Sequence, residues 1–180
     1  MRERDTMRSL AYTDSLTGLC NRRGMQMALQ SALAQASPQR LVALYLMDLD
    51  GFKPVNDTYG HDVGDDLLVA VGHRLEANVR QNTDLVARLG GDEFIVMARE
   101  LATPEQAQEL GRALLHAFEK PFRLSHLSIQ VGLTIGYALA PLDSDDAQHL
   151  VRLADAAMYA GKESGKHCIR RNPGELALAS

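Results

Sequence analysis

The sequence LVALYLMDLD at residues 41–50 determines which fold class this chain belongs to. Residues 41–47 form an uninterrupted apolar run that includes a β-branched valine and a tyrosine, which is typical of a strand covered on both faces. The run ends in two acids, Asp48 and Asp50. Its seven residues are far fewer than the roughly 20 that a membrane-spanning helix requires, so the run predicts a buried central strand.

Amphipathic helices are predicted both before and after this strand in the sequence. Apolar residues at four-residue spacing predict a helix over 21–36, which ends before Pro38. Apolar faces of the same kind predict further helices over 65–80, 104–118 and 146–160. The charged segment 1–13 has a short apolar stripe and predicts the end of a stalk helix.

Strand-like runs alternate with these helices. Runs at 84–89 and 94–98 flank Gly90-Gly91-Asp92-Glu93 and predict a β-hairpin with glycines and acids at its tip. A long strand is predicted over 129–140 and an edge strand over 167–171. Segment 51–64, rich in turn residues, predicts a functional loop or a short helix with loops. This order of elements predicts an α+β fold, an α/β sandwich in which helices flank one central, mostly antiparallel sheet.

Length, composition and charge exclude several classes of protein. A chain of 180 residues predicts one domain. Ordinary contents of hydrophobic (46%) and charged (23%) residues exclude general disorder, and the net charge of −4 argues against a nucleic-acid partner. The N-terminal residues lack the apolar core of a secretory signal, so we expect a cytoplasmic protein without membrane contact. The two cysteines are interpreted as free thiols.

Two acidic clusters coincide with predicted strand ends. If the first strand and the hairpin are neighbours in the sheet, Asp48 and Asp92 converge on one hard cation, because Mg²⁺ favours one or two carboxylates together with substrate phosphates. The pair Gly90 and Gly91 would let a phosphate approach the backbone closely. The alternative is that Asp48 and Asp50 cap the following turn and that the glycines only supply positive φ angles.

The sequence contains no complete motif for a P-loop, a zinc site or a catalytic nucleophile. Gly165-Lys166 lacks the first glycine and the Ser/Thr of a P-loop, and a predicted helix precedes it rather than follows it. The six histidines show no paired metal-ligand spacing, and no nucleophile elbow is present. These exclusions favour a site for a metal and a phosphate.

Four separated motifs link the chain to a known family. RLGGDEF lies at 88–94, and DSLTGL followed by NRR lies within 14–23. DLD at 48–50 leads into a segment that ends with Gly64-Asp65, and DAAMYAGK lies at 155–162. On these motifs the chain resembles the GGDEF domain of bacterial diguanylate cyclases from about Asp14 to Arg171.

The resemblance implies a palm-like nucleotide-cyclase fold and a reaction that joins two GTP molecules into cyclic di-GMP with release of two pyrophosphates. Catalysis then requires a homodimer, because each subunit holds one GTP and offers half of a two-substrate site. The implied organisation is a stalk-helix remnant at 1–13, a GGDEF domain at 14–172 and a C-terminal tail at 173–180. It further implies an upstream sensor domain and allows a downstream phosphodiesterase domain.

By position, the resemblance assigns metal ligands and catalytic residues. Asp48, the Leu49 carbonyl, Asp92 and Glu93 would hold Mg²⁺ or Mn²⁺, two ions per GTP, and Asp48, Asp92 and Glu93 are the implied catalytic residues. Two divalent ions suit an in-line attack of a ribose 3′-hydroxyl on an α-phosphate. Glu93 either supports metal binding or takes the hydroxyl proton, and both roles stay open.

Recognition of GTP is assigned in the same way. Asn56 and Asp65 correspond to the pair that reads the guanine edge, since a carboxylate accepts from guanine N–H groups that adenine lacks. The substrate-binding set also includes Phe52, Lys53, Gly90, Gly91, Lys162 and Lys166. Lys166-His167 replace the Arg-Asn that is usual in the family, which implies weaker triphosphate binding. For Lys53 and Lys166 a solvated surface lysine remains the alternative.

The product-inhibition motif of the family, Arg-x-x-Asp, is degenerate in this chain. Gln81 stands where the arginine is expected, and Asp84 is retained. Because the forked donors of arginine recognise phosphate and guanine edges, we expect weak or absent product feedback. Arg80, in the adjacent position, is able to substitute in part.

Two functions of different classes compete. The first is an active, GTP-consuming diguanylate cyclase, which the intact acids at 48, 92 and 93 favour. The second is a GTP-binding regulatory module of a composite GGDEF/phosphodiesterase signalling protein, for which the altered Lys166 and Gln81 leave room. An assay for cyclic di-GMP separates the two.

Overall fold

A five-stranded sheet forms the centre of the structure, a computed structural model that describes residues 10–171. Its strands are β1 (Leu41–Asp50), β2 (Asp84–Gly90), β3 (Glu93–Leu101), β6 (Gly132–Ala140) and β7 (Ile169–Arg171). They lie in the order β2-β3-β1-β6-β7, and all pairs are antiparallel except β6 with β7. The predicted mostly antiparallel central sheet is therefore confirmed, with the run at 41–50 as its central strand.

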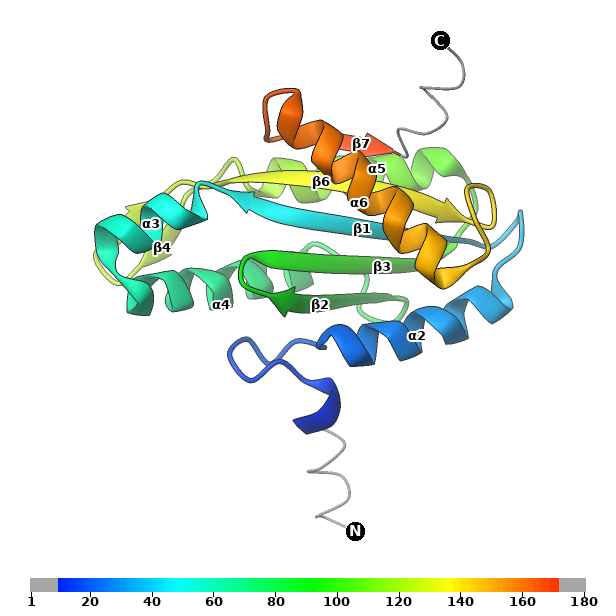
Figure 1. Cartoon of the computed structure of the whole chain (residues 1–180), viewed down its shortest axis with the longest axis horizontal. Coiled ribbons are helices and arrows are strands. Elements are labelled where there is room, and N and C mark those ends of the chain that lie inside the picture. The colour runs from blue at the N-terminus through cyan, green and yellow to red at the C-terminus, as the bar shows by residue number, and fades with distance from the viewer. Residues whose placement is uncertain (1–9, 172–180) are drawn as a thin grey trace.

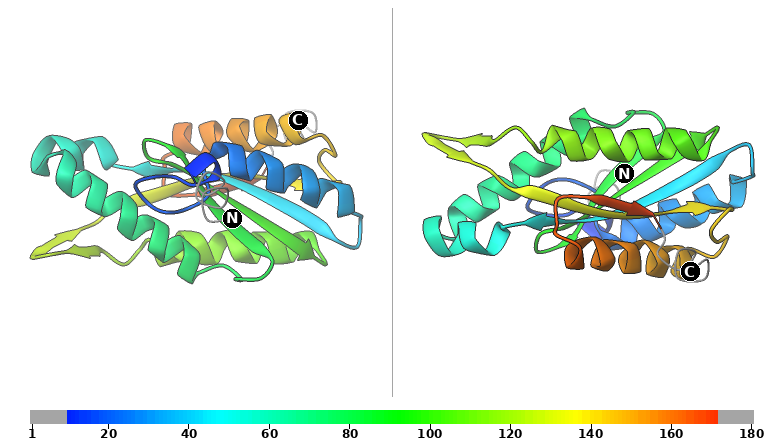
Figure 2. Two further views of the ribbon diagram at one scale, coloured as in Figure 1. Left: turned by 90° about the horizontal axis from the view of Figure 1, so that it is seen from below. Right: turned by 90° about the horizontal axis from the view of Figure 1, so that it is seen from above.

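Within the described residues, helices α2 to α6 and a small hairpin surround the sheet. They are α2 (Arg22–Gln35), α3 (Phe52–Tyr59), α4 (His61–Ala77), α5 (Pro104–Ala117), α6 (Ala147–Glu163) and the hairpin β4 (Phe122–Leu124) with β5 (Leu127–Ile129). Helices α2 and α6 cover one face of the sheet and α4 and α5 the other (Figure 1 and Figure 2). This arrangement confirms the predicted α+β fold with helices that flank one sheet.

The two faces of β1 carry two separate apolar cores. Ala43, Tyr45 and Met47 pack towards α4 and α5, whereas Leu44 and Leu46 pack towards α2 and α6. Side chains alternate along a strand, so the acids at positions 48 and 50 continue the face that α6 covers. The alternation thus places both carboxylates beside the C-terminal half of α6.

Helix α6 lies very close to β6. A Cβ atom built at Gly136 would lie 2.1 Å from the backbone nitrogen of Met158 and 2.2 Å from the carbonyl oxygen of Ala154. Only glycine permits this approach, because both contacted atoms belong to the helix backbone. The close contact fixes the central part of α6 against the middle of β6, where Gly136 lies opposite Leu46 of β1.

Several element boundaries differ from the predictions. The strand predicted over 41–47 continues to Asp50, because its acids pair with β3 and β6. Segment 51–64 contains helix α3 and the first turn of α4, joined at Gly60 (φ 91°), so the second of the predicted helices begins at His61 and ends at Ala77. Burial of Val55 against the core outweighs the turn-forming composition of this segment.

The long strand predicted over 129–140 is confirmed only from Gly132 onwards. Ile129 ends β5, which pairs with β4 in a separate two-stranded sheet, and β6 begins at Gly132 and pairs with β1. The chain changes partner at Gln130, whose side chain donates to the Phe118 carbonyl at 2.9 Å. An apolar run carries no signal of such a change of partner.

The predicted stalk helix and C-terminal tail lie mostly outside the described residues. Most of segment 1–13 and all of 173–180 lie outside the described residues, and only Leu10–Tyr12 is described as helical. Within residues 10–171, no helix is long and apolar enough to cross a membrane.

Candidate active site

The predicted acidic clusters meet at one end of the sheet. Asp48 lies opposite Glu93 in the β1–β3 register, and the Leu49 N–H donates to the Asp92 carbonyl at 3.4 Å. Figure 1 shows the end of β1 beside the turn between β2 and β3, with α3 following directly. The strand end and the hairpin tip are therefore neighbours, which was the condition for the two clusters to act together.

The carboxyl groups of Asp48 and Asp92 are close enough to influence each other. Burial raises the pKa of Asp92 to about 6, and the adjacent Asp48 adds to the effect by accepting a hydrogen bond from the protonated form and repelling the ionised one. Lys162 opposes the shift with its positive charge. With both carboxylates ionised, Asp48 Oδ1 is buried and has no hydrogen-bond partner among the described residues. No described hydrogen-bond donor therefore compensates the negative charge at Asp48 Oδ1.

This repulsion predicts a pH-dependent stability. The pKa of Asp92 is 3.8 when unperturbed and about 6 in the folded protein, so between these values the folded state holds a proton that the unfolded chain has released. Folding stability accordingly falls as the pH rises through this window. In metal-free protein above pH 6, we expect Asp92→Asn to raise the melting temperature by about 2–4 °C, the size of a 1 kcal/mol effect. In thermal melts at decreasing pH, the gain in melting temperature should become smaller as the pH approaches 3.8. A gain that does not change with pH would contradict the assignment.

Asp50, the second acid of the strand end, has a different environment. Its carboxylate accepts hydrogen bonds from the Thr134 hydroxyl at 2.8 and 2.9 Å and from the His167 N–H at 2.8 Å. These contacts tie β1 to β6 and to the turn after α6. Asp50 is thus satisfied by the protein itself, which agrees with a structural role. Sequence reasoning missed Thr134, although a single threonine in the apolar run of β6 was a usable signal.

Lys162 is the described cation that faces the acidic pair. Its Nζ lies 2.8 Å from Asp48 Oδ2 and 3.8 Å from Asp50 Oδ1, and 28% of its side chain is exposed. The partly exposed side chain remains accessible to an anion. Lys53 on α3 and Lys166 in the turn after α6 are exposed, and the structure does not bring them to the acidic pair.

The donor set at Asp48 and Asp92 fits a cation that arrives with an anionic ligand. Among residues 10–171, no group of three or more His, Cys, Asp or Glu side chains would hold a metal alone. Two carboxylates, one with an unpartnered oxygen, match the preference of Mg²⁺ for one or two carboxylates plus phosphate oxygens. Glu93 is exposed at the same hairpin.

The glycine pair shapes the hairpin tip. Gly90 and Gly91 have φ angles of 135° and 50°, and a Cβ atom at either position would meet no atom within 4 Å. The positive φ angles explain why glycine occupies both positions. The open space also leaves the backbone accessible, so the conformational explanation and a phosphate-binding role are compatible.

An ion pair connects the hairpin tip to the N-terminal part of the domain. Arg88 donates to Asp14 Oδ1 at 3.0 Å and to the Gly91 carbonyl at 2.9 Å, and the side chains of the ion pair are 13% and 14% exposed. Burial alone would raise the pKa of Asp14, but hydrogen bonds from Thr17 and the charge of Arg88 hold this pKa below its ordinary value. The contact spans 74 residues of sequence, and no local pattern could have predicted it.

The residues assigned to guanine lie on the helix pair α3–α4. Asn56 is half-buried on α3, with Oδ1 buried and without a hydrogen-bond partner among the described residues. Asp65 is exposed in the first half of α4, and Phe52 is the half-buried first residue of α3. The structure therefore places these side chains on the element that directly follows the strand end with Asp48 and Asp50.

Gln81 and Asp84, which the sequence predicts to be a degenerate product-inhibition motif, lie just before and at the start of β2, at the opposite end of that strand from the hairpin tip. Arg80 binds Asp84 through its backbone N–H at 2.9 Å and through Nε and Nη2 at 3.1 and 2.9 Å. The Asp84 side chain is 0% exposed, while Gln81 is exposed. Cavities of about 340 and 320 Å³ lie beside this segment. Asp84 is thus already paired within its own turn.

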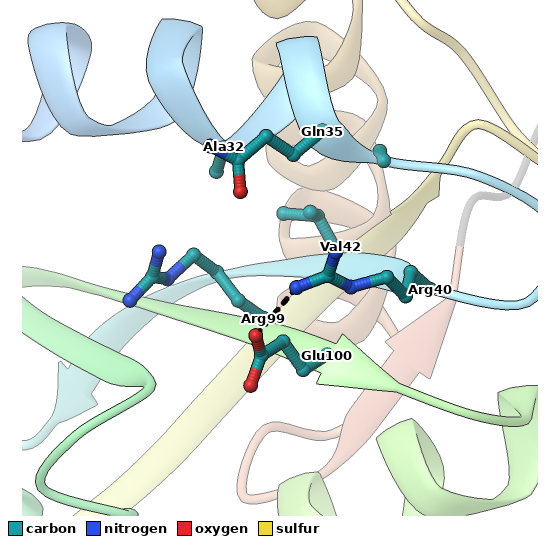
Figure 3. A pocket seen from close by; sticks show the side chains of 7 residues that line it. Ala32, Gln35, Arg40, Val42, Arg99 and Glu100 are labelled. Carbon is teal, nitrogen blue, oxygen red and sulfur yellow. Dashed lines mark hydrogen bonds and ion pairs between the residues drawn. The ribbon is translucent and has the colours of Figure 1, made fainter.

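A further cavity lies between the end of α2 and the end of β3, where Arg40 and Glu100 form an ion pair at 2.6 Å (Figure 3). Its volume of about 10 Å³ is sufficient for at most one water molecule. The cavity is too small to bind a substrate.

Comparisons with known proteins agree with the sequence motifs. The family model for "Diguanylate cyclase, GGDEF domain" matches residues 11–168. The bifunctional diguanylate cyclase/cyclic di-GMP phosphodiesterase MucR of Pseudomonas aeruginosa is 43% identical over 159 residues, which cover 88% of this chain and 23% of MucR. The cyclic di-GMP phosphodiesterase PdeR of Escherichia coli is 39% identical over 166 residues, or 92% of this chain and 24% of PdeR.

A solved structure shows the same fold. The GGDEF domain of TpbB from Pseudomonas aeruginosa superimposes with a TM-score of 0.86 and 36% identity, covering 93% of this chain and 99% of that one. The chain spans about a quarter of the length of the curated relatives MucR and PdeR. With a family model matched over most of its residues and relatives near 40% identity over about nine-tenths of its length, this chain belongs to the GGDEF domain family of diguanylate cyclases.

Proposed function

We propose that this domain condenses two GTP molecules into cyclic di-GMP and releases two pyrophosphates. The observation that carries the proposal is the pair of Asp48 and Asp92 at an open sheet end, where Asp48 Oδ1 has no partner among the described residues. A buried, unpartnered carboxylate oxygen is costly unless a ligand completes it. In a GGDEF domain that ligand is a divalent cation bound together with GTP.

The acids would hold Mg²⁺ or Mn²⁺, two ions per GTP. Asp48, Asp92, Glu93 and the Leu49 carbonyl are the proposed ligands. The bound ions would supply charge neutralisation at the α-phosphate and would lower the pKa of the attacking 3′-hydroxyl. The raised pKa of Asp92 means that its proton must leave before the carboxylate binds a cation, so binding weakens below about pH 6.

The remaining residues orient and neutralise the substrate. Lys162, whose Nζ lies 2.8 Å from Asp48 Oδ2, would bind phosphate oxygens and the departing pyrophosphate. Glu93, exposed at the hairpin tip, accepts the 3′-hydroxyl proton on its carboxylate or supports the cation. Gly90 and Gly91 offer backbone to the phosphates, and Lys53 and Lys166 add positive charge from flanking elements.

Guanine selection is assigned to Asn56 and Asp65, with Phe52 beside them at the start of α3. Asp65 is exposed and therefore available to accept from the guanine N1–H and N2–H₂ groups. Each domain binds one GTP, so two domains must face each other to complete both phosphodiester bonds. A homodimer aligned by an upstream segment is the proposed active assembly.

Product feedback through the degenerate motif is proposed to be weak or absent. Asp84 is committed to Arg80 and Thr83, and Gln81 lacks the forked donors of arginine. We expect added cyclic di-GMP to leave the initial rate unchanged, and Asp84→Ala to have no effect on the response to product. Rate measurements over a range of product concentrations check this. Inhibition at micromolar product that Asp84→Ala abolishes would show that the site works.

The decisive experiment is incubation with Mg²⁺ and GTP, with cyclic di-GMP and pyrophosphate quantified. The domain should be assayed alone and fused to a dimeric coiled coil, so that weak association does not hide activity. Product formation supports the cyclase. GTP binding without product in the fused dimer would instead favour a regulatory GTP-binding module, a role consistent with the similarity to PdeR, which is named as a phosphodiesterase.

A further inference from the structure

The side chain of Asn56 packs against a position on α4 that is open because residue 64 is glycine. A Cβ atom at Gly64 would lie 1.8 Å from Asn56 Oδ1, 2.9 Å from its Cγ and 3.5 Å from its Nδ2, and these are the three nearest atoms. We call this space the Gly64 notch. The amide of Asn56 therefore occupies the volume that any larger residue at position 64 would need.

Packing, and not hydrogen bonding, holds this amide. Oδ1 is buried and has no partner among the described residues. A buried acceptor without a donor costs about 1–3 kcal/mol, so no hydrogen bond compensates for the position of the amide. The Gly64 notch is accordingly what keeps Oδ1 against α4 and leaves Nδ2 farther from the helix.

Glycine at position 64 is unfavourable for the helix itself. Gly64 lies inside the 17-residue helix α4, where glycine is about 1 kcal/mol less favourable than alanine. Gly64 has no positive φ that would demand glycine, in contrast to Gly60 at the start of the helix. The space that Asn56 needs is the physical reason for glycine that the structure offers at this position.

We propose that Gly64 is a positioning residue for guanine recognition, because its missing Cβ seats the Asn56 amide and sets its position relative to the adjacent Asp65. The inference rests on the proposed function, in which Asn56 and Asp65 read the guanine edge. Asp65 directly follows Gly64, so one turn of α4 carries both the notch and the carboxylate. Alanine at position 64 would expel the amide while the helix remains intact.

A double-mutant cycle tests the proposal. The wild type, Gly64→Ala, Asn56→Ala and the double variant are titrated with 3′-deoxy-GTP and 3′-deoxy-ATP in the presence of Mg²⁺, since these nucleotides lack the attacking hydroxyl and cannot condense. We expect Gly64→Ala to weaken 3′-deoxy-GTP binding about tenfold, the loss of one good hydrogen bond, and to leave 3′-deoxy-ATP binding unchanged. In the Asn56→Ala background, Gly64→Ala should weaken binding no further.

Gly72→Ala is the matched control. It makes the same substitution in the same helix, but the three atoms nearest to its Cβ all belong to the Leu19 side chain, the first at 3.1 Å. It should leave the preference for guanine intact. If Gly64→Ala prevents folding, the double variant is tested by a thermal melt. Removal of the Asn56 side chain should then restore a folded protein. A double variant that also fails to fold would overturn the proposal.

Two outcomes separate this inference from the proposed function. If Asn56→Ala weakens 3′-deoxy-GTP binding and Gly64→Ala does not, the notch proposal is wrong and guanine reading by Asn56 stands. If Asn56→Ala itself changes nothing, the assignment of Asn56 to guanine is wrong, and the notch proposal fails with it. An equal loss from Gly64→Ala in both backgrounds would also overturn the proposal.

Discussion

Replacing Asp92 by alanine should abolish cyclic di-GMP synthesis while the domain stays folded. Asp92 is the acid of the hairpin tip that lies against Asp48, and the pair is the proposed cation site. A bound metal ion supplies several kcal/mol of transition-state stabilisation, and each 1.36 kcal/mol is a factor of ten in rate. Loss of about 4 kcal/mol therefore predicts a decrease in turnover of roughly 1000-fold or more. Chromatographic quantification of product over time measures it.

Asp145→Ala is the control for this substitution, because Asp145 is an exposed acid in the loop before α6. It should retain the activity of the parent protein. Thermal denaturation of both variants separates loss of function from loss of folding, and removal of repulsion with Asp48 means that Asp92→Ala should melt no lower than the parent above pH 6. An Asp92→Ala variant that keeps more than about a tenth of the activity would contradict the assignment of this acid.

The second large effect concerns stability. Gly136→Ala is expected to destabilise the domain by about 3 kcal/mol or more, at the upper end of the usual cost of overpacking. The added methyl group would lie 2.1 Å from Met158 N and 2.2 Å from the Ala154 carbonyl oxygen. These are helix backbone atoms, so α6 itself must move. At about 2–4 °C per kcal/mol for a domain of this size, the melting temperature should fall by about 6–12 °C.

The same substitution should also impair the site. Movement of α6 away from β6 would withdraw Lys162 from Asp48, where the ion pair now measures 2.8 Å. We therefore expect activity to fall even at temperatures where the variant remains folded. Gly72→Ala again serves as the comparison, since its nearest contact is a flexible leucine side chain. A melting temperature within about 2 °C of the parent would show that α6 tolerates displacement.

Local sequence predicted those elements whose signals are local. Helix α2 begins where the Asn21 side chain accepts from the Gly24 N–H at 3.0 Å, and α5 begins at Pro104 after the Thr103 cap. The apolar run of β1 and the glycine-tipped hairpin were equally clear. Within 51–64 a short helix was only one of two alternatives and the early start of α4 was not predicted, because turn-forming residues dominate there and the packing of Val55 is a tertiary effect.

The sequence predicted that Asp48 and Asp92 would meet, but it did not predict the contacts around them. The approach of Asp48 to Asp92 followed from the assumption that strand and hairpin are neighbours. The sequence could not show that Asp50 is satisfied by Thr134 while an oxygen of Asp48 is left without a partner. These differences depend on which side chain of another element reaches each carboxylate.

The two-sided burial of β1 has a consequence for how the chain selects its strand alignment. Because both faces of β1 are apolar, a one-residue shift in its register would still bury apolar side chains on both faces. The hydrophobic pattern alone therefore discriminates poorly between neighbouring alignments. A slipped strand would, however, turn Asp48 and Asp50 away from Lys162 and Thr134. The polar contacts at the strand end thus help to select the correct register of β1 in the sheet.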